Sequence, residues 1–148
     1  MARGVPDLEP GEALRAMAGA SFRGGLMATV RTTFAFGSAR VRNNAFEDWK
    51  LPAEKAGFPT AGPEAILAVT DRRLLVYFTT FWAERPGDLG GDIELDRVYQ
   101  VAVRRHGLVL GIAFALTSGE VVEFEAMRSI RLRRFARAVQ RELAERGR

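Results

Sequence analysis

The sequence of 148 residues contains no cysteine and a single histidine, His106. Without cysteine, disulfide bonds, thiolate-bound zinc and cysteine nucleophiles are all excluded. The longest apolar run is the nine residues from Leu108 to Leu116, whereas a helix that spans a bilayer needs about 20. The first residues contain no apolar signal segment. We therefore expect a cytoplasmic protein.

Lysine is scarce: only Lys50 and Lys55 are lysines among the 22 basic residues, and the other 20 are arginines. The formal net charge of +4 is unevenly distributed along the chain. Residues 64–125 carry a net charge of −4, and residues 126–148 carry +6. This distribution argues against binding of nucleic acid and favours one local basic face.

The composition, with 47% hydrophobic and 27% charged residues, is typical of one globular domain over residues 1–148. Within it we expect a loose lead-in over residues 1–8, a helical insertion over residues 24–63 and a C-terminal helix over residues 127–146. Residues 12–22 fit a strand or a helix.

The helical insertion is predicted from the spacing of its apolar residues. Val41, Phe46 and Trp49 share one face of a helix over residues 39–50. Pro52 is expected to stop or start a helix, so the insertion should hold one or two short helices.

From Glu64 onward the hydrophobic period changes to two, which is typical of strands. The expected strands cover residues 65–70, 73–81, 93–96, 99–104, 108–117 and 121–125. Residues 83–92 are expected to form a loop, while Gly107 and Gly119 favour tight turns. We expect Tyr99 on the same face as Val101 and Val103, and Leu108 on the same face as Leu110. The outward Leu75 and Tyr77 need cover, for which the insertion is the candidate.

The C-terminal helix carries an apolar stripe at steps of three and four residues. Its members are Leu132, Phe135, Ala136, Val139 and Leu143. Arginines occupy its other faces. The expected fold is therefore mainly β with α (α+β): a small antiparallel barrel of six or seven strands, capped by this helix.

Several segments carry a resemblance to a known family. Residues 66–77, ILAVTDRRLLVY, look like the second and third strands of bacterial pleckstrin-homology-like (GRAM-related) domains. Residues 93–98, IELDRV, resemble the next strand, residues 117–120, TSGE, the late hairpin, and residues 10–12, PGE, the opening turn. Phe135 sits where the family's helix packs an aromatic ring on the barrel. The sequence departs from the family at the insertion, which replaces a first hairpin that holds the headgroup site in lipid-binding members.

The sequence shows no catalytic motif, and we expect a protein without enzymatic activity, cofactor or metal. His106 lies in a predicted turn, which is typical of a solvated histidine. Asp88, Asp92, Glu94 and Asp96 lack the order of a calcium loop and are expected to be a solvated strand face.

We expect a binding module whose partner is a protein or peptide, docking on a sheet edge or beside the C-terminal helix. The alternative is peripheral binding of anionic lipid headgroups at the inner face of the membrane. The candidate surface joins arginines at turns and on the helix with two aromatic residues at a loop edge. Its members are Arg72, Arg73, Phe81, Trp82, Arg104, Arg105, Arg134, Arg137 and Arg141. A plainly solvated helix face remains the simpler interpretation of the last three.

Overall fold

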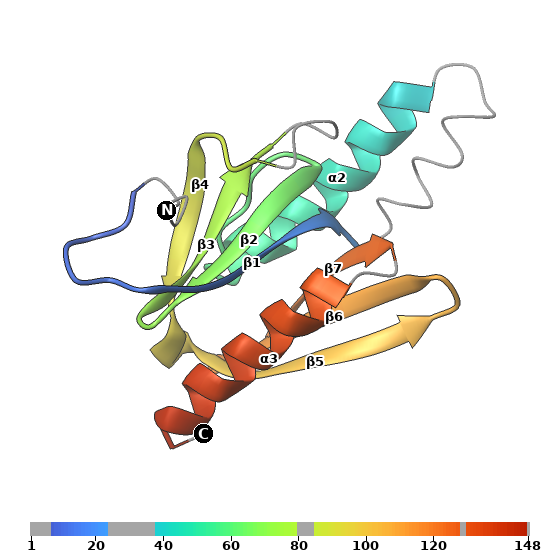
Figure 1. Ribbon diagram of the computed structural model, residues 1–148. Coiled ribbons are helices and arrows are strands. Elements are labelled where there is room, and N and C mark those ends of the chain that lie inside the picture. The colour runs from blue at the N-terminus through green and yellow to red at the C-terminus, as the bar shows by residue number, and fades with distance from the viewer. Residues whose placement is uncertain (1–6, 24–37, 80–84, 128–129, 148) are drawn as a thin grey trace.

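The computed structural model describes residues 7–23, 38–79, 85–127 and 130–147. Seven strands form one antiparallel sheet in the order β4-β3-β2-β1-β7-β6-β5, with helices α2 and α3 packed against it (Figure 1). The strands are β1 Leu14–Phe22, β2 Glu64–Thr70, β3 Arg73–Phe78, β4 Leu89–Glu94, β5 Val98–His106, β6 Val109–Leu116 and β7 Val121–Met127. The helices are α2 Ser38–Lys55 and α3 Ile130–Glu145.

The sheet has two halves that share β1. This strand pairs with β2 from Leu14 to Ser21, but with β7 only through Ser21 and Phe22. β4 and β5 do not pair with each other, so the sheet is open where a closed barrel was expected. The architecture is otherwise the expected one, broadly a pleckstrin-homology-like α+β fold with a helix after the first strand.

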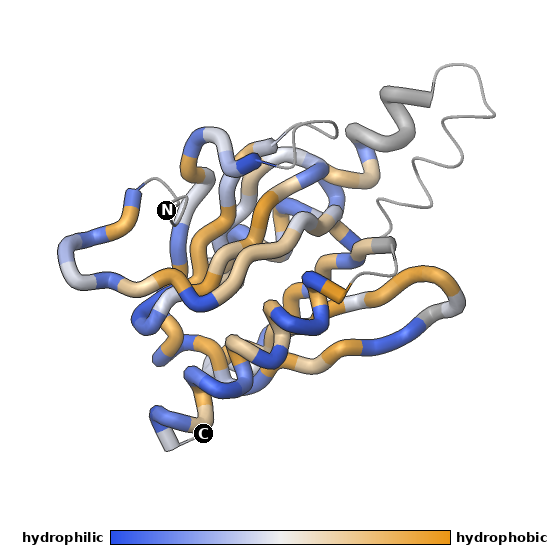
Figure 2. The backbone as a smooth tube through the Cα atoms, in the orientation of Figure 1, coloured by the Kyte–Doolittle hydropathy of each residue, from blue (hydrophilic) through white to orange (hydrophobic). Residues whose placement is uncertain are grey.

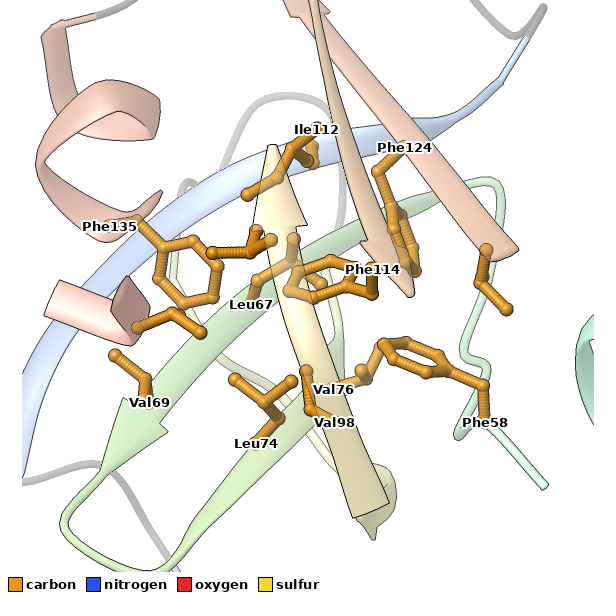
Figure 3. Close-up of a cluster of buried hydrophobic side chains, with 14 of the residues drawn as sticks. Phe58, Leu67, Val69, Leu74, Val76, Val98, Ile112, Phe114, Phe124 and Phe135 are labelled. Atoms are coloured by element: carbon orange, nitrogen blue, oxygen red, sulfur yellow. The ribbon is translucent and has the colours of Figure 1, made fainter. Parts of the chain in front are cut away.

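The main core lies between the two halves and α3. Phe135 is fully buried and meets Phe114 edge-on, with ring centroids 6.3 Å apart (Figure 3). All five predicted stripe residues of α3 are buried. Figure 2 shows the corresponding pattern: hydrophobic residues follow β2, β3 and β6, and hydrophilic residues recur along α3.

In the described part of the insertion, residues 38–63, one helix is present, α2, and it passes through Pro52. Proline lacks the N–H that would donate to the preceding turn, but its carbonyl still accepts from Ala56 N at 3.0 Å. The Pro52 prediction was therefore wrong. Ala53 joins the main core, and the Trp49 indole donates to the carbonyl of Glu123 at 2.9 Å.

A second apolar cluster lies on the opposite face of β2 and β3. It consists of Ile66, Ala68, Leu75 and Tyr77, and the side chains packed against it are Leu8, Leu14 and Leu89. The insertion was expected to cover Leu75 and Tyr77, but its described part does not, because α2 packs on the main core. The N-terminal segment supplies part of the cover, and it begins inside the predicted lead-in.

Irregular backbone explains the remaining differences. A register shift between Val98 and Gln100 exposes Tyr99, and Leu108 lies in the turn before β6, where it is 64% exposed. Tyr99 had been expected on the face of Val101 and Leu108 on the face of Leu110, both of which are buried. β4 begins at Leu89, within the predicted loop, and β3 ends at Phe78. Gly107 and Gly119 take positive φ angles in their hairpin turns, as predicted.

Over residues 7–23, 38–79, 85–127 and 130–147, no helix is both long and apolar enough to cross a membrane.

Candidate functional site

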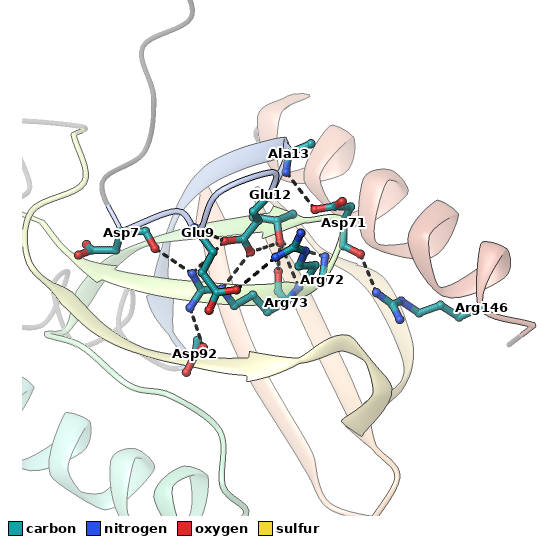
Figure 4. A network of polar contacts seen from close by, with 10 residues as sticks. Asp7, Glu9, Glu12, Ala13, Asp71, Arg72, Arg73, Asp92 and Arg146 are labelled. Carbon is teal, nitrogen blue, oxygen red and sulfur yellow. Dashed lines mark hydrogen bonds and ion pairs between the residues drawn. The ribbon is translucent and has the colours of Figure 1, made fainter.

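The first pair of predicted site residues, Arg72 and Arg73, lies at the β2–β3 turn. Arg73 is held by a fork of two hydrogen bonds to the Glu12 carboxylate, both 2.9 Å long (Figure 4). Its third guanidinium nitrogen meets Asp92 at 2.7 Å. We call Glu12, Thr70, Arg73 and Asp92 the Arg73 cluster. Only 11% of the Arg73 side chain is exposed, so the sequence-based assignment of Arg73 to a binding surface has no structural support.

Glu12 is the buried acid of the Arg73 cluster. Its side chain is fully enclosed, and it accepts hydrogen bonds from Arg73, from the Thr70 hydroxyl at 2.7 Å and from the Glu9 N–H at 3.0 Å. The Arg73 hydrogen bonds, with smaller contributions from Thr70 and Glu9, lower the pKa of Glu12 from 4.5 to about 2 in spite of burial. The carboxylate is therefore charged at neutral pH and serves to fix the N-terminal segment on β2 and β3.

Arg72 and Arg146 extend this polar region over the surface. Arg72 forms an exposed ion pair with Glu9 at 3.2 Å. Arg146, just after α3, donates to the Asp71 carbonyl at 2.6 Å and pairs with Asp96 at 3.1 Å. The C-terminal end of α3 thus lies beside the β2–β3 turn.

The arginines of α3 have different surroundings. Arg134, Arg137 and Arg141 are separated by three and four residues, so they share the solvent side of the helix. We call them the basic face. In the part of the chain that the structure describes, none of the three has an ion pair, and the buried Glu142 pairs with Arg15 at 2.8 Å.

Arg104 and Arg105 are exposed near the end of β5. Gln140 of α3 contacts the Val101 carbonyl, and from there β5 runs away from the C-terminal end of the helix (Figure 1). The β2–β3 turn, with Arg72 and Arg73, and the end of β5, with Arg104 and Arg105, therefore lie toward opposite ends of α3. The predicted surface is not one continuous patch. Phe81 and Trp82 lie outside the described residues.

A groove lies between α2 and β4, and the sequence analysis did not predict it. The groove has a volume of about 500 Å³ and opens to solvent. Its walls come from α2, from the segment after α2, and from the ends of β3 and β4. Its lining includes Phe46, Phe58, Phe78, Gly90, Gly91 and Asp92. We call it the α2–β4 groove.

Glycines make this groove possible. A Cβ atom on Gly90 would lie 2.5 Å from the Thr60 carbonyl oxygen, and one on Gly91 would lie 2.9 Å from the Pro59 Cβ. The chain after α2 therefore passes over β4 only because both positions lack a side chain. This glycine pair is the signal that could have pointed to a close approach, but a loop over residues 83–92 was predicted instead.

No arrangement of metal ligands accompanies these surfaces. Within the described residues, no three His, Cys, Asp or Glu side chains are grouped so that they could hold a metal ion. Asp92 and Asp96, two of the carboxylates considered from the sequence, are instead paired with Arg73 and Arg146.

No family model matches this sequence, and neither does any curated protein. The function is therefore inferred from the fold and its surfaces.

Proposed function

We propose that the protein is a non-enzymatic binding module of the pleckstrin-homology-like (GRAM-related) type, and that it docks a partner protein in the α2–β4 groove. The observation that carries the proposal is that this groove opens beside a sheet edge. β4 is the last strand of the sheet, and no strand in the described parts of the chain pairs with its outer side. An unpaired edge offers backbone donors and acceptors to a partner.

The groove also offers apolar surface next to that edge. Phe78 lines it and is 46% exposed, while Phe46 and Phe58 are buried in its wall. The exposed ring of Phe78 beside an unpaired strand supplies the apolar contact that a docking segment needs. The strand order and the C-terminal helix support the assignment to the family.

The experiment compares capture of partners from a native lysate by the wild-type protein and by Phe78→Asp. Leu51→Asp is the matched control, because Leu51 is an exposed apolar residue on α2 that does not line the groove. We expect a specific protein to be retained by the wild type and by Leu51→Asp and lost with Phe78→Asp, quantified by mass spectrometry. Equal retention by all three folded proteins would contradict docking in the groove.

The basic face supports a second candidate, binding to anionic lipid headgroups at the inner face of the membrane. Its three arginines have no carboxylate partner in the described parts of the chain, so their charge is available to phosphate. Ile130, one helical turn before Arg134, is 72% exposed and provides an apolar contact.

Sedimentation with phosphatidylglycerol vesicles and with phosphatidylcholine vesicles tests this candidate. We expect binding to phosphatidylglycerol only, weakening as salt rises, and lost when Arg134, Arg137 and Arg141 are all replaced by Gln. Absence of binding to phosphatidylglycerol vesicles at low salt would exclude it.

A further inference from the structure

We infer that the segment bound in the α2–β4 groove is an extended peptide in which basic and apolar residues alternate, and that it pairs with β4 as an additional strand. This inference rests on the proposed function, because it assigns the ligand of the same groove. It depends on which side chains of β4 face each side of the sheet.

The register with β3 fixes those faces. Asp92 lies opposite Leu75 and Glu94 lies opposite Arg73, on the side of the sheet that carries the second apolar cluster, and Asp92 also borders the groove. Gly91 lies opposite Val76 and Ile93 opposite Leu74, on the side of the main core. The two sides of β4 are thus chemically different, with carboxylates on one side and apolar or small residues on the other.

The carboxylate side selects basic residues. Asp92 uses one oxygen for Arg73 and keeps 46% of its side chain exposed. Glu94 is exposed and has no ion pair within the described residues. A strand added next to β4 would place every second side chain beside these two carboxylates, where Lys or Arg forms a favourable cross-strand pair.

The groove side selects apolar residues. Pro59 and Thr60 lie against Gly90 and Gly91 on this side, and the half-exposed ring of Phe78 completes an apolar wall next to the strand. Because side chains of a strand alternate between the two sides of a sheet, the residues between the basic ones would face this wall. The expected ligand therefore alternates Lys or Arg with residues such as Val, Ile or Phe.

A second copy of this chain fits the same edge poorly. Two β4 strands paired with each other would bring Asp92 and Glu94 of one copy beside the same carboxylates of the other, and like charges across a strand pair repel. Charged residues on edge strands prevent self-association in this way. The acidic edge thus disfavours its own copy and favours a basic segment.

The test is selection from a displayed library of random linear peptides on the full-length protein, followed by titration of the enriched synthetic peptides. We expect alternating basic and apolar residues in the enriched set. Glu94→Lys should weaken their binding by about tenfold or more, and so should Phe78→Asp. Glu145→Lys, an exposed charge reversal on α3, should leave it unchanged. The amides of β4 should gain protection from hydrogen exchange when the peptide binds.

The outcomes separate the inference from the proposed function. Peptides that depend on Phe78 but are acidic, or that bind without protecting β4 amides, would overturn strand addition and leave docking in the groove intact. Peptides whose binding does not depend on Phe78, or no enrichment at all, would overturn both. Circular dichroism confirms that each variant is folded before it is compared.

Discussion

Two groups of arginines on this protein have opposite surroundings. Arg73 lies within 3 Å of two carboxylates and is almost enclosed, whereas Arg134, Arg137 and Arg141 face solvent without a carboxylate partner among the described residues. In the sequence all four are arginines within one expected surface. The difference shows that an arginine's role depends on the acids that the fold brings to it, and Glu12 is 61 residues away from Arg73.

The two groups also act on different parts of the molecule. The Arg73 cluster ties the N-terminal segment, the β2–β3 turn and β4 together, because its members come from each of these. The basic face connects nothing within the described structure. We therefore expect changes in the Arg73 cluster to alter the free energy of unfolding, and changes in the basic face to alter binding alone.

The basic face can be a separate surface only if α3 is fixed on the core, and Phe135→Ala tests whether it is. Phe135 is fully buried against Phe114, so the truncation should cost about 3–5 kcal/mol of the free energy of unfolding. Urea denaturation measures the loss. A cost below about 1 kcal/mol, the range of ordinary surface changes, would mean that α3 is not docked.

Arg73→Met tests the Arg73 cluster. Removing the guanidinium leaves the Glu12 carboxylate buried without its main partner, which should cost about 3 kcal/mol or more. Arg72→Met is the control: its ion pair with Glu9 is exposed, so the change should stay within about 1 kcal/mol. The double variant Glu12→Gln, Arg73→Met should recover part of the loss, because no charge is then left buried. Equal effects of Arg72→Met and Arg73→Met would remove the contrast between the two residues.

Acid provides a second test of the Arg73 cluster. The pKa of Glu12 is about 2 in the folded protein and 4.5 in the reference state, so the unfolded chain takes up the proton first as the pH falls. The stabilisation from Glu12, up to about 3 kcal/mol, is complete above pH 4.5 and is lost as the pH falls through 2. The stability difference between the wild type and Glu12→Gln should therefore shrink over this range. A constant difference would show that the charge of Glu12 is not the source of its effect.

Much of the fold could be predicted from local periodicity. Apolar residues recur at every second position in the strands after Glu64 and at steps of three and four in α3. Both patterns are local, because each element packs one face on a shared core. The position of Tyr99 could not be predicted, because a one-residue register shift reverses the face of a strand without leaving a mark in the sequence. Helix α2 was extended past Pro52 by packing of Ala53 and Ala56, which outweighs the local cost of proline.

The candidate site was less predictable than the fold. The sequence marks Arg73 and Glu12 as charged residues, but their pairing depends on long-range registry of the N-terminal segment with β2. The α2–β4 groove combines residues from α2, β3 and β4, and Gly90 had been assigned to a loop. The composition and spacing of α3 did identify the basic face, because a helical face is a local property.

The smallest expected effect on stability belongs to the basic face. Replacing Arg134, Arg137 and Arg141 together by Gln should change the free energy of unfolding by no more than about 0.5 kcal/mol per residue, because each is exposed and without an ion pair in the described parts of the chain. Arg15→Gln is the contrasting variant: it removes the partner of the buried Glu142 and should cost more than any one of the three. Urea denaturation of the triple variant, the three single variants and Arg15→Gln ranks them. A triple variant as unstable as Arg73→Met would mean that these arginines stabilise the fold. The basic face would then not be a surface that is free to bind a partner.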